Sequence, residues 1–291
     1  MRLMPQWRHA APRDTSSRNQ HLHVLTACCM LKSLKNIRPA VKLTTRILNT
    51  MAWYCSGSSN NELIENLSRE GLIKNERVKR AMMAVDRGHY APSRPYSDSP
   101  QPIGHGATIS APHMHGHACE YLINYLRPGS RVLDIGSGSG YLTHVIAKLV
   151  VDQSSSEGLR GQVVGVDHIQ ELVTQAQTNM SKSEDGRNLL ETGSVKFIKA
   201  DGRRGWPEGA PYDAIHVGAA AEELHPRLVE QLRAPGRMFI PVNVEYKHGI
   251  LANTAFGGGQ YIWVVDKRED GSIHKEKVFQ VRYVPLTDAP K

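Results

Sequence analysis

Short apolar segments alternate with segments of helical periodicity between residues 131 and 242 of this chain. Five of them have the composition of buried strands, at 131–135, 162–167, 195–198, 212–217 and 237–242. Three have the apolar spacing of helices, at 141–151, 169–180 and 222–232. Strands that alternate with helices in this way form a mostly parallel sheet covered on both faces. The sequence therefore predicts an α/β fold with a doubly wound, mostly parallel sheet.

The segments that flank this alternation contain further predicted elements. They are, in chain order, a helix at 63–73 capped by Asn60 or Asn61, a helix at 78–85, an irregular Pro-, Gly- and Ser-rich stretch at 92–112, a helix at 113–126, and a closing hairpin at 260–265 and 278–284. The dipeptide Asp270-Gly271 favours a tight hairpin turn and is expected to join the last two strands.

Three glycines follow the first strand of the alternation, at Gly136, Gly138 and Gly140. Glycines at a strand-to-helix turn let the backbone approach a ligand closely beside a helix N-terminus. A dinucleotide-binding turn requires glycine or alanine at position 141, where this chain has Tyr141. The turn therefore predicts a nucleotide-like ligand, and an NAD-dependent oxidoreductase is the weakest of the candidate functions.

Acidic residues stand at the ends of three predicted strands. Asp134 precedes the glycines, Asp167 ends the second strand, and Asp201-Gly202 follows the third. Ligands of open α/β sheets lie beyond the carboxyl ends of the strands, where an acid after the second strand accepts hydrogen bonds from a ribose diol. Acids and glycines without a phosphate-binding lysine predict a nucleoside that carries no phosphates. S-adenosylmethionine is the commonest such cofactor.

Several longer stretches resemble one enzyme family, the protein-L-isoaspartate (D-aspartate) O-methyltransferases. They are Met51-Ala52-Trp53, Asp86-Arg87-Gly88-His89-Tyr90, residues 107–115 (Ala-Thr-Ile-Ser-Ala-Pro-His-Met-His), residues 133–140, residues 165–168, residues 210–220 and residues 283–288. The glycine turn alone indicates only a methyltransferase, whereas the Ala-Thr-Ile-Ser-Ala-Pro-His-Met run is specific to this family.

The resemblance implies a fold of the class I S-adenosylmethionine-dependent methyltransferase (Rossmann-like) type. It also implies a repair enzyme that transfers the methyl group of S-adenosylmethionine to the free α-carboxylate of L-isoaspartyl and D-aspartyl residues, so its partners are damaged proteins or peptides. The family's active-site serine falls on Ser110. An α-carboxylate is already ionised at neutral pH, so Ser110 is expected to orient it as a hydroxyl donor and not to act as a nucleophile.

The resemblance and the glycine turn together imply a set of cofactor contacts. They are Ala107, Thr108, Ile109, Ser110, His115, Asp134, Gly136, Ser137, Gly138, Asp167, His168, Asp201, Gly202 and Thr287. No metal is expected. His113, His115 and His117 alternate along a predicted helix, where residues two apart do not face each other.

The substrate is expected to lie extended, because an isoaspartyl link adds a methylene to the peptide backbone. A strand-like groove between residues 103–114 and residues 284–286 would suit such a chain. One departure from the family pattern lies nearby, since residues 243–254 look like an insertion after the fifth strand. Two alternatives stay open beside the repair enzyme. One is a methyltransferase for another carboxylate or an amine, and the other is a non-catalytic module that recognises damaged proteins.

Charge divides the chain into two parts. Residues 1–50 contain nine of the 36 Lys and Arg and one of the 28 Asp and Glu, so residues 51–291 contain 27 of each and have no net charge. We interpret residues 1–50 as a basic extension and residues 51–291 as the methyltransferase domain. A neutral domain argues against nucleic-acid binding, which requires clustered Lys and Arg. The domain gives no reason to need a partner subunit, so a monomer is expected.

The four cysteines form no CxxC pair and are too few for a disulfide framework, which favours a reducing compartment. We therefore expect a cytoplasmic protein. The alternative is a mitochondrial one, if the basic, acid-poor residues 1–50 act as a transit peptide. No apolar stretch reaches the ~18 residues of a membrane-spanning helix, so no membrane association is expected.

Overall fold

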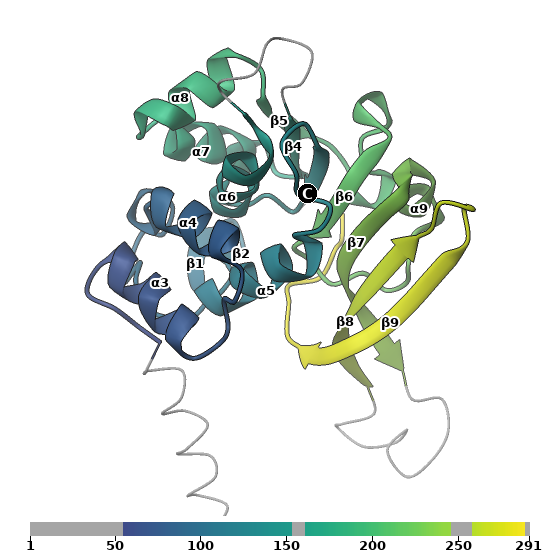
Figure 1. Ribbon diagram of the computed structural model, residues 1–291, viewed down its shortest axis with the longest axis horizontal. Coiled ribbons are helices and arrows are strands. Elements are labelled where there is room, and N and C mark those ends of the chain that lie inside the picture. Colours follow the sequence, from purple (N-terminus) through teal and green to yellow (C-terminus); the bar gives the residue numbers. More distant parts are fainter. Residues whose placement is uncertain (1–54, 153–160, 246–257, 289–291) are drawn as a thin grey trace, which may run out of the picture. The chain divides into compact units, whose positions relative to one another are not determined.

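The computed structural model of the protein describes residues 55–152, 161–245 and 258–288. Its centre is a seven-stranded sheet in the order β5-β4-β3-β6-β7-β8-β9 (Figure 1). The strands are β3 (Arg131–Ile135), β4 (Gln162–Asp167), β5 (Val195–Lys199), β6 (Tyr212–Val217), β7 (Leu232–Glu245), β8 (Gly258–Lys267) and β9 (Ile273–Val281).

Strand direction reverses twice across this sheet, before and after β8, at the end that follows the parallel strands. β3 to β7 pair in parallel, whereas β8 pairs antiparallel with β7 and β9 antiparallel with β8. The predicted mostly parallel sheet and closing hairpin are both confirmed, with Gly271 at a φ of +79° in the hairpin turn. The last strand ends at Val281 and not at residue 284. Beyond Val281 the main chain bonds to a side chain and not to a strand, since the Gln260 side-chain amide donates to the Tyr283 carbonyl at 3.2 Å.

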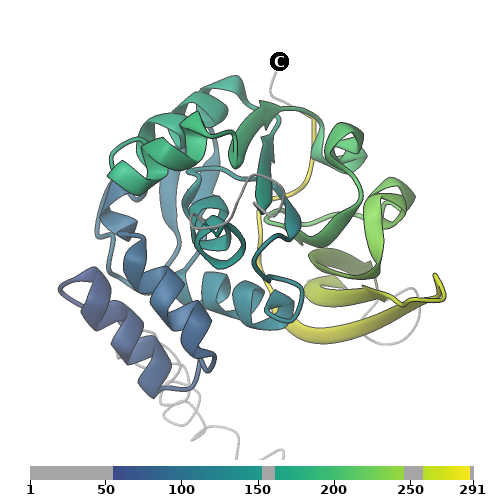
Figure 2. The ribbon, with the colours of Figure 1, turned by 45° about the horizontal axis from the view of Figure 1, so that its top comes forward.

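Buried side chains alternate between the two faces of the sheet. Val132, Val163 and Ala214 belong to a core that also contains side chains of α5 (Pro112–Leu122), α6 (Tyr141–Val150) and α7 (Gln170–Met180). Their neighbours along the strands belong to a second core with α9 (Pro226–Gln231). Figure 2 shows α5, α6 and α7 on one side of the sheet and α9 on the other. The doubly wound prediction is therefore confirmed.

Three short helices complete the described fold. α3 (Asn60–Arg69) and α4 (Glu76–Ala84) add buried side chains to the first core, and α8 (Glu184–Glu191) follows α7. The predicted cap of α3 was wrong, because Ser59 accepts the hydrogen bond from the Glu62 N–H. Asn60 is buried inside the helix and donates its side-chain amide to the Met82 carbonyl, 3.0 Å away.

The irregular stretch before α5 contains a small hairpin that the sequence did not indicate. β1 (Gln101–Gly104) pairs antiparallel with β2 (Ala107–Ile109). Its turn has three consecutive residues of positive φ, which are Gly104 at +92°, His105 at +53° and Gly106 at +71°. Two glycines permit this left-handed turn at little steric cost. The hairpin delivers β2 directly into α5, which begins at Pro112 and ends at Leu122, earlier than predicted.

The predicted insertion at 243–254 overlaps β7, because Asn243 pairs with Gln260 and the ladder continues to Glu245 and Gly258. The first three residues of the presumed insertion are thus strand. Its remaining residues lie outside the described part, as does the predicted extension at 1–50. Within 55–152, 161–245 and 258–288, no helix is both long and apolar enough to cross a bilayer.

Candidate active site

The turn between β3 and α6 brings backbone N–H groups close to the end of β4. The Gly136 N–H donates to the Val166 carbonyl at 2.8 Å, and the Gly138 N–H donates to Asp167 Oδ2 at 3.1 Å. Gly136, Gly138 and Gly140 all have positive φ, at +72°, +51° and +86°. A Cβ on Gly140 would lie 3.0 Å from the Ala176 Cβ, so this glycine lets α6 and α7 approach each other.

A cavity of about 210 Å³ lies at the carboxyl ends of β3, β4 and β6, beyond the glycine turn. We call it the first cavity. Its lining residues are His105, Gly106, Ala107, Thr108, Ile135, Gly136, Gly138, Val166, Asp167, His168, Ile169, Leu172, Gly202, Gly218, Ala219, Val284, Pro285, Leu286, Thr287 and Asp288. None of these is Lys or Arg. The walls are mostly apolar, and the buried carboxylate of Asp167 is oriented at the end of β4 by the N–H groups of Gly138 and Ile169.

Eight of the residues predicted to contact a cofactor line the first cavity. They are Ala107, Thr108, Gly136, Gly138, Asp167, His168, Gly202 and Thr287. They come from the β1–β2 hairpin, the ends of β3, β4 and β5, and the segment after β9. The structure therefore brings together residues that are up to 180 positions apart in the chain.

The other predicted contacts lie outside the lining of the first cavity. Ile109 is part of the hydrophobic core, and Ser137 has a buried hydroxyl with no hydrogen-bond partner among the described residues. Asp134 is only 1% exposed. Its Oδ1 lies 2.8 Å from His216 Nδ1, and its Oδ2 accepts from the Thr143 hydroxyl at 2.5 Å. Asp134 thus binds protein groups next to the glycine turn and does not line the cavity.

Asp201 is engaged by a neighbouring arginine. Arg203 Nε and Nη2 each donate to this carboxylate at 2.9 Å, and Arg203 also pairs with Asp288. Hydrogen bonds from the Arg203 side chain lower the pKa of Asp201. Asp201, Arg203 and Thr287 line a neighbouring surface hollow that shares His168, Thr287 and Asp288 with the first cavity. Arg203 therefore links the end of β5 to the last described residues of the chain.

A second cavity, of about 370 Å³, lies between α5 and the end of β9. Its lining residues are Pro100, Thr108, Ser110, Ala111, His113, Met114, His117, Phe279, Gln280, Val281, Arg282, Tyr283 and Val284. Thr108 and Val284 line both cavities, so the two share a wall. The second cavity lies where the sequence predicted a groove for an extended peptide, although its second wall is formed by 279–284 and not by 284–286.

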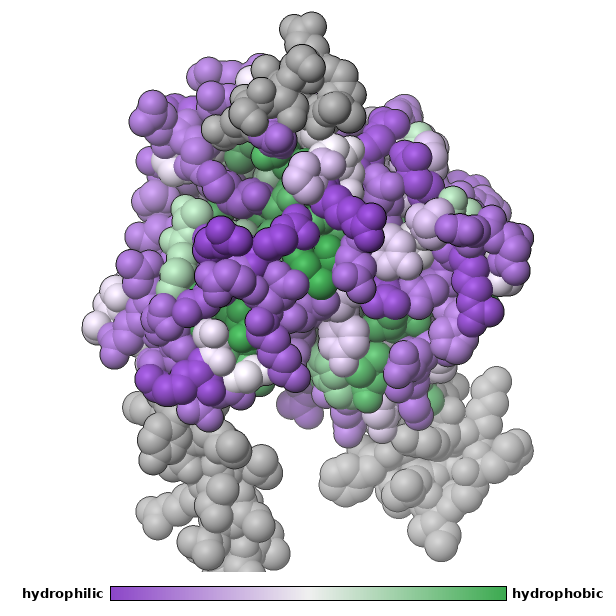
Figure 3. Space-filling view, viewed as in Figure 1, coloured by the Kyte–Doolittle hydropathy of each residue, from purple (hydrophilic) through white to green (hydrophobic). Residues whose placement is uncertain are grey.

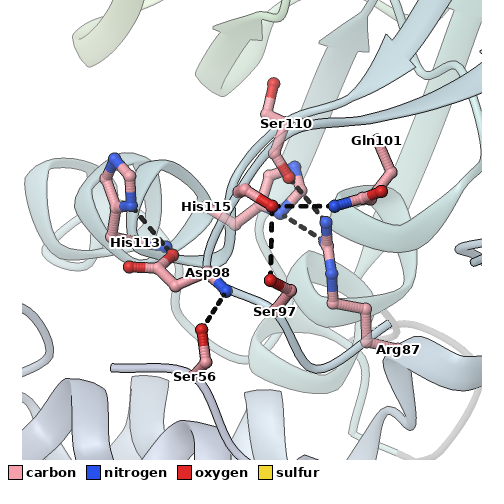
Figure 4. A network of polar contacts seen from close by, with 9 residues as sticks. Ser56, Arg87, Ser97, Asp98, Gln101, Ser110, His113 and His115 are labelled. Carbon is pink, nitrogen blue, oxygen red and sulfur yellow. Dashed lines mark hydrogen bonds and ion pairs between the residues drawn. The ribbon is translucent and has the colours of Figure 1, made fainter. Parts of the chain in front are cut away.

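Ser110 stands at the corner between β2 and α5, with its hydroxyl and carbonyl on opposite sides. The carbonyl accepts from Arg87 Nη2 at 2.8 Å, and Figure 4 shows the hydroxyl pointing away from Arg87. Burial raises the pKa of Tyr283 above its ordinary value, and a hydrogen bond with the Ser110 side chain acts in the opposite direction. The Ser110 hydroxyl therefore lies beside the phenol of Tyr283, a partly buried residue, on the wall of the second cavity.

The histidines of α5 differ in their surroundings. His113 and His117 both line the second cavity, with ring centroids 6.4 Å apart, because residues four apart share a helix face. The expectation that these histidines do not face each other holds for residues two apart and does not apply to this pair. His113 Nδ1 lies 2.8 Å from the buried Asp98, and the His113 N–H also donates to this carboxylate. His115 faces the protein interior and is 7% exposed. Among the described residues, no three metal-ligating side chains cluster.

Sequence reasoning missed two kinds of site residue. The apolar walls Ile135, Val166 and Leu172 are ordinary core residues in composition, and only their place at strand ends could have marked them. Arg87 lies in one of the stretches that resemble the family, and the sequence alone predicts no role for it. It is 0% exposed, and its contacts with Ser110 and His115 connect segments 23 and 28 residues apart.

The chain is similar to known proteins over most of its length. The family model "Protein-L-isoaspartate(D-aspartate) O-methyltransferase (PCMT)" matches residues 58–291. Protein-L-isoaspartate O-methyltransferase 2 of Arabidopsis thaliana is 47% identical over 235 residues, which are 80% of this chain and 69% of the relative. Protein-L-isoaspartate O-methyltransferase of Caenorhabditis elegans is 45% identical over 237 residues, which are 81% of this chain and 96% of the relative.

Among solved structures, a protein-L-isoaspartate O-methyltransferase of Plasmodium falciparum in complex with S-adenosyl-L-homocysteine matches with a TM-score of 0.68. It is 36% identical, and the match covers 79% of this chain and 99% of that one.

Proposed function

This chain belongs to the protein-L-isoaspartate(D-aspartate) O-methyltransferase family, and we propose that it repairs damaged proteins by methylating them. It is an S-adenosylmethionine-dependent methyltransferase. Its acceptor is the free α-carboxylate of L-isoaspartyl and D-aspartyl residues in protein or peptide chains. The observation that carries the proposal is the wall shared by the two cavities at Thr108 and Val284, because a donor and an acceptor molecule must meet for a methyl group to pass between them.

The first cavity has the chemistry that a nucleoside cofactor without phosphates requires. The lining carries no Lys or Arg, its walls are apolar, and Asp167 can accept hydrogen bonds from a ribose diol. Gly138 has a φ of +51°, which glycine adopts with little strain, and a Cβ there would lie 3.3 Å from the Ile103 Cδ1, a tight contact. We propose that the eight predicted contacts that line the cavity hold the cofactor. When bound, S-adenosylmethionine supplies a methyl group on a positively charged sulfur.

The second cavity is proposed to bind the acceptor peptide. An α-carboxylate has a reference pKa of about 3.3–3.7 and needs no general base at neutral pH. The chain's work is then to position this carboxylate and to exclude water. Ser110 supports such a role, because its hydroxyl lies on the wall of the second cavity and can donate to one carboxylate oxygen while the other oxygen attacks.

The segment after β9 supports the exclusion of water. Val284, Pro285 and Leu286 line the first cavity. The Ala220 N–H donates to the Val284 carbonyl and the Leu286 N–H donates to the Ala220 carbonyl, both at 2.8 Å. These bonds fix the segment against the end of β6, where it covers the first cavity beside the wall shared with the second.

The decisive experiment uses the full chain, labelled S-adenosylmethionine and two peptides that differ only in an isoaspartyl or an aspartyl link, with small acids and amines as further acceptors. We expect transfer to the isoaspartyl peptide alone. Equal transfer to both would reject the repair function, and transfer only to small acids or amines would support the alternative acceptor classes. Binding of S-adenosyl-L-homocysteine without any transfer would support a non-catalytic module.

Substitution Ser110→Ala tests the assigned catalytic residue. We expect kcat to fall on the order of 10–100-fold, because the acceptor loses an orienting contact. Calorimetric affinity for S-adenosyl-L-homocysteine should stay close to that of the wild type. Ser181→Ala is the matched control, since among the described residues this hydroxyl bonds only to the Gln177 carbonyl at the end of α7. An unchanged kcat in Ser110→Ala removes the serine from the mechanism.

We further propose that residues 51–291 act as a cytoplasmic monomer that binds neither nucleic acid nor membranes. The face drawn in Figure 3 is mainly hydrophilic, with smaller hydrophobic areas, and Ile273 is the only large hydrophobic side chain that is exposed among the residues that the structure describes. The free, buried thiols of Cys55 and Cys119 fit a reducing compartment. Light scattering and cell fractionation test these points.

A further inference from the structure

One arginine is entirely buried beside the candidate active site. Arg87 begins a short 3-10 helix, η2 (Arg87–His89), between α4 and β1. Its guanidinium lies 5.3 Å from the centroid of the Tyr141 ring. Among the described residues no carboxylate forms an ion pair with it, and its Nε has no hydrogen-bond partner. Burial lowers the pKa of Arg87 to about 10, which leaves it charged at neutral pH.

The two terminal nitrogens of Arg87 contact two residues of the 107–115 run. Nη2 donates to the Ser110 carbonyl at 2.8 Å, and Nη1 lies 3.3 Å from His115 Nδ1 (Figure 4). A guanidinium has donors and no acceptor. His115 Nδ1 must therefore be the acceptor, so the imidazole is neutral and carries its proton on Nε2. Full burial, followed by the charge of Arg87, also lowers the pKa of His115 well below its ordinary value.

These contacts fix the corner between β2 and α5 from the interior. Ala111, which precedes α5, provides no side-chain cap, so the corner lacks the usual local support. A buried charge without an ion pair is costly, and apolar residues of similar volume are often at least as stabilising. Stability alone therefore does not account for this arginine. Its donors instead orient the residue whose hydroxyl faces the second cavity.

We propose that Arg87 is a positioning residue for methyl transfer, which holds the Ser110 main chain and the Nε2–H tautomer of His115 with one planar guanidinium. The expected effect on the rate rests on the proposed function, whereas the expected tautomer of His115 rests on geometry alone. Lysine has a single ammonium group and cannot bind both acceptors in this planar arrangement.

The kinetic test compares Arg87→Met and Arg87→Lys with the wild type in the full chain. We expect Arg87→Met to lower kcat for the isoaspartyl peptide on the order of 10–100-fold. The KM for the peptide should change by less than about threefold, since the loss lies mainly in alignment. Arg87→Lys should recover part of the rate. A folded Arg87→Met variant with wild-type kcat overturns the proposal.

Arg77→Met is the matched control for a structural role. Arg77, on α4, is partly buried where Arg87 is fully buried, and it likewise binds main chain, donating to the carbonyls of Leu126 at 2.5 Å and Leu149 at 3.1 Å. We expect Arg77→Met to lower the melting temperature and to leave kcat nearly unchanged. An equal loss of kcat in the Arg77 and Arg87 variants would mean that Arg87 has a structural role only, which overturns the proposal.

The tautomer of His115 is tested in the wild-type chain, so the proposal stays falsifiable if the Arg87 variants do not fold. Nitrogen NMR of chain labelled in histidine, assigned with His115→Gln, should show a neutral imidazole protonated on Nε2 near neutral pH. A proton on Nδ1, or a charged ring, contradicts the Arg87 contact. If the wild type transfers no methyl group while the tautomer is as expected, the proposed function fails and the positioning geometry stands.

Discussion

Asp134 has the lowest exposure of the acids at the strand ends, at 1%, and both its oxygens bind protein groups. Asp134→Ala should therefore lower the free energy of unfolding by about 2–4 kcal/mol even without cofactor, because His216 and Thr143 lose their buried partner. Urea unfolding of the cofactor-free chain measures this effect. Thr143→Val, which removes one bond and keeps the carboxylate, should have a smaller effect. An unfolding midpoint equal to that of the wild type would show that Asp134 serves only a ligand.

Single residues could be predicted from the sequence where their role is local. Gly138 and Asp167 follow from the glycine turn and the second strand end, and both line the first cavity. The surroundings of Asp134 depend on its pairing with His216, 82 positions away in the neighbouring strand β6. The contact of Arg87 with Ser110 likewise depends on how the chain folds back on itself. Sequence patterns within one element do not contain such contacts.

The β3–α6 turn depends on Gly140 for two reasons, its left-handed backbone conformation and the lack of space for a Cβ. Gly140 has a φ of +86°, and a Cβ would lie 3.0 Å from the Ala176 Cβ and 3.1 Å from the Phe197 Cζ. Gly140→Ala should lower the free energy of unfolding by about 2–4 kcal/mol, through backbone strain and overpacking. Gly271→Ala is the control, since its φ is +79° but nothing lies within 4 Å of its Cβ. We expect about 1–2 kcal/mol for the control. Equal effects in urea unfolding would exclude the packing contribution.

Helices and strands could be predicted where their buried residues recur with a regular period. The five parallel strands are mostly apolar, and four of them were found within one residue of their observed bounds. The fifth, β7, begins at Leu232 and ends at Glu245, so it extends beyond the predicted 237–242 at both ends. α8 was missed because only Leu189 and Gly186 among its residues are buried, which is too few for a clear period. The β1–β2 hairpin was missed because its strands have four and three residues. β9 was placed too late, since most of its residues are exposed and its composition resembles a loop.

The segment after β9 forms part of the wall of the first cavity. Residues 284–288 line the first cavity, and Arg203 pairs with Asp288. Ending the chain after Tyr283 should weaken S-adenosyl-L-homocysteine binding by about tenfold or more, a change of about 1.4 kcal/mol or more. Calorimetry measures this affinity. Asp288→Ala, which removes the exposed ion pair with Arg203 and a single lining side chain, should have a smaller effect. Undiminished affinity in the shortened chain would contradict the proposed cofactor site.

The shared boundary at Thr108 and Val284 has a thermodynamic consequence for the catalytic cycle. A ligand that changes the position of these two residues changes the affinity of the other site, and linkage requires the two changes in affinity to be equal. If a bound peptide tightens the enzyme's hold on the methyl donor by some factor, the donor tightens its hold on the peptide by the same factor. Any such cooperativity would be built into a boundary of two side chains, with no moving domain needed to transmit it.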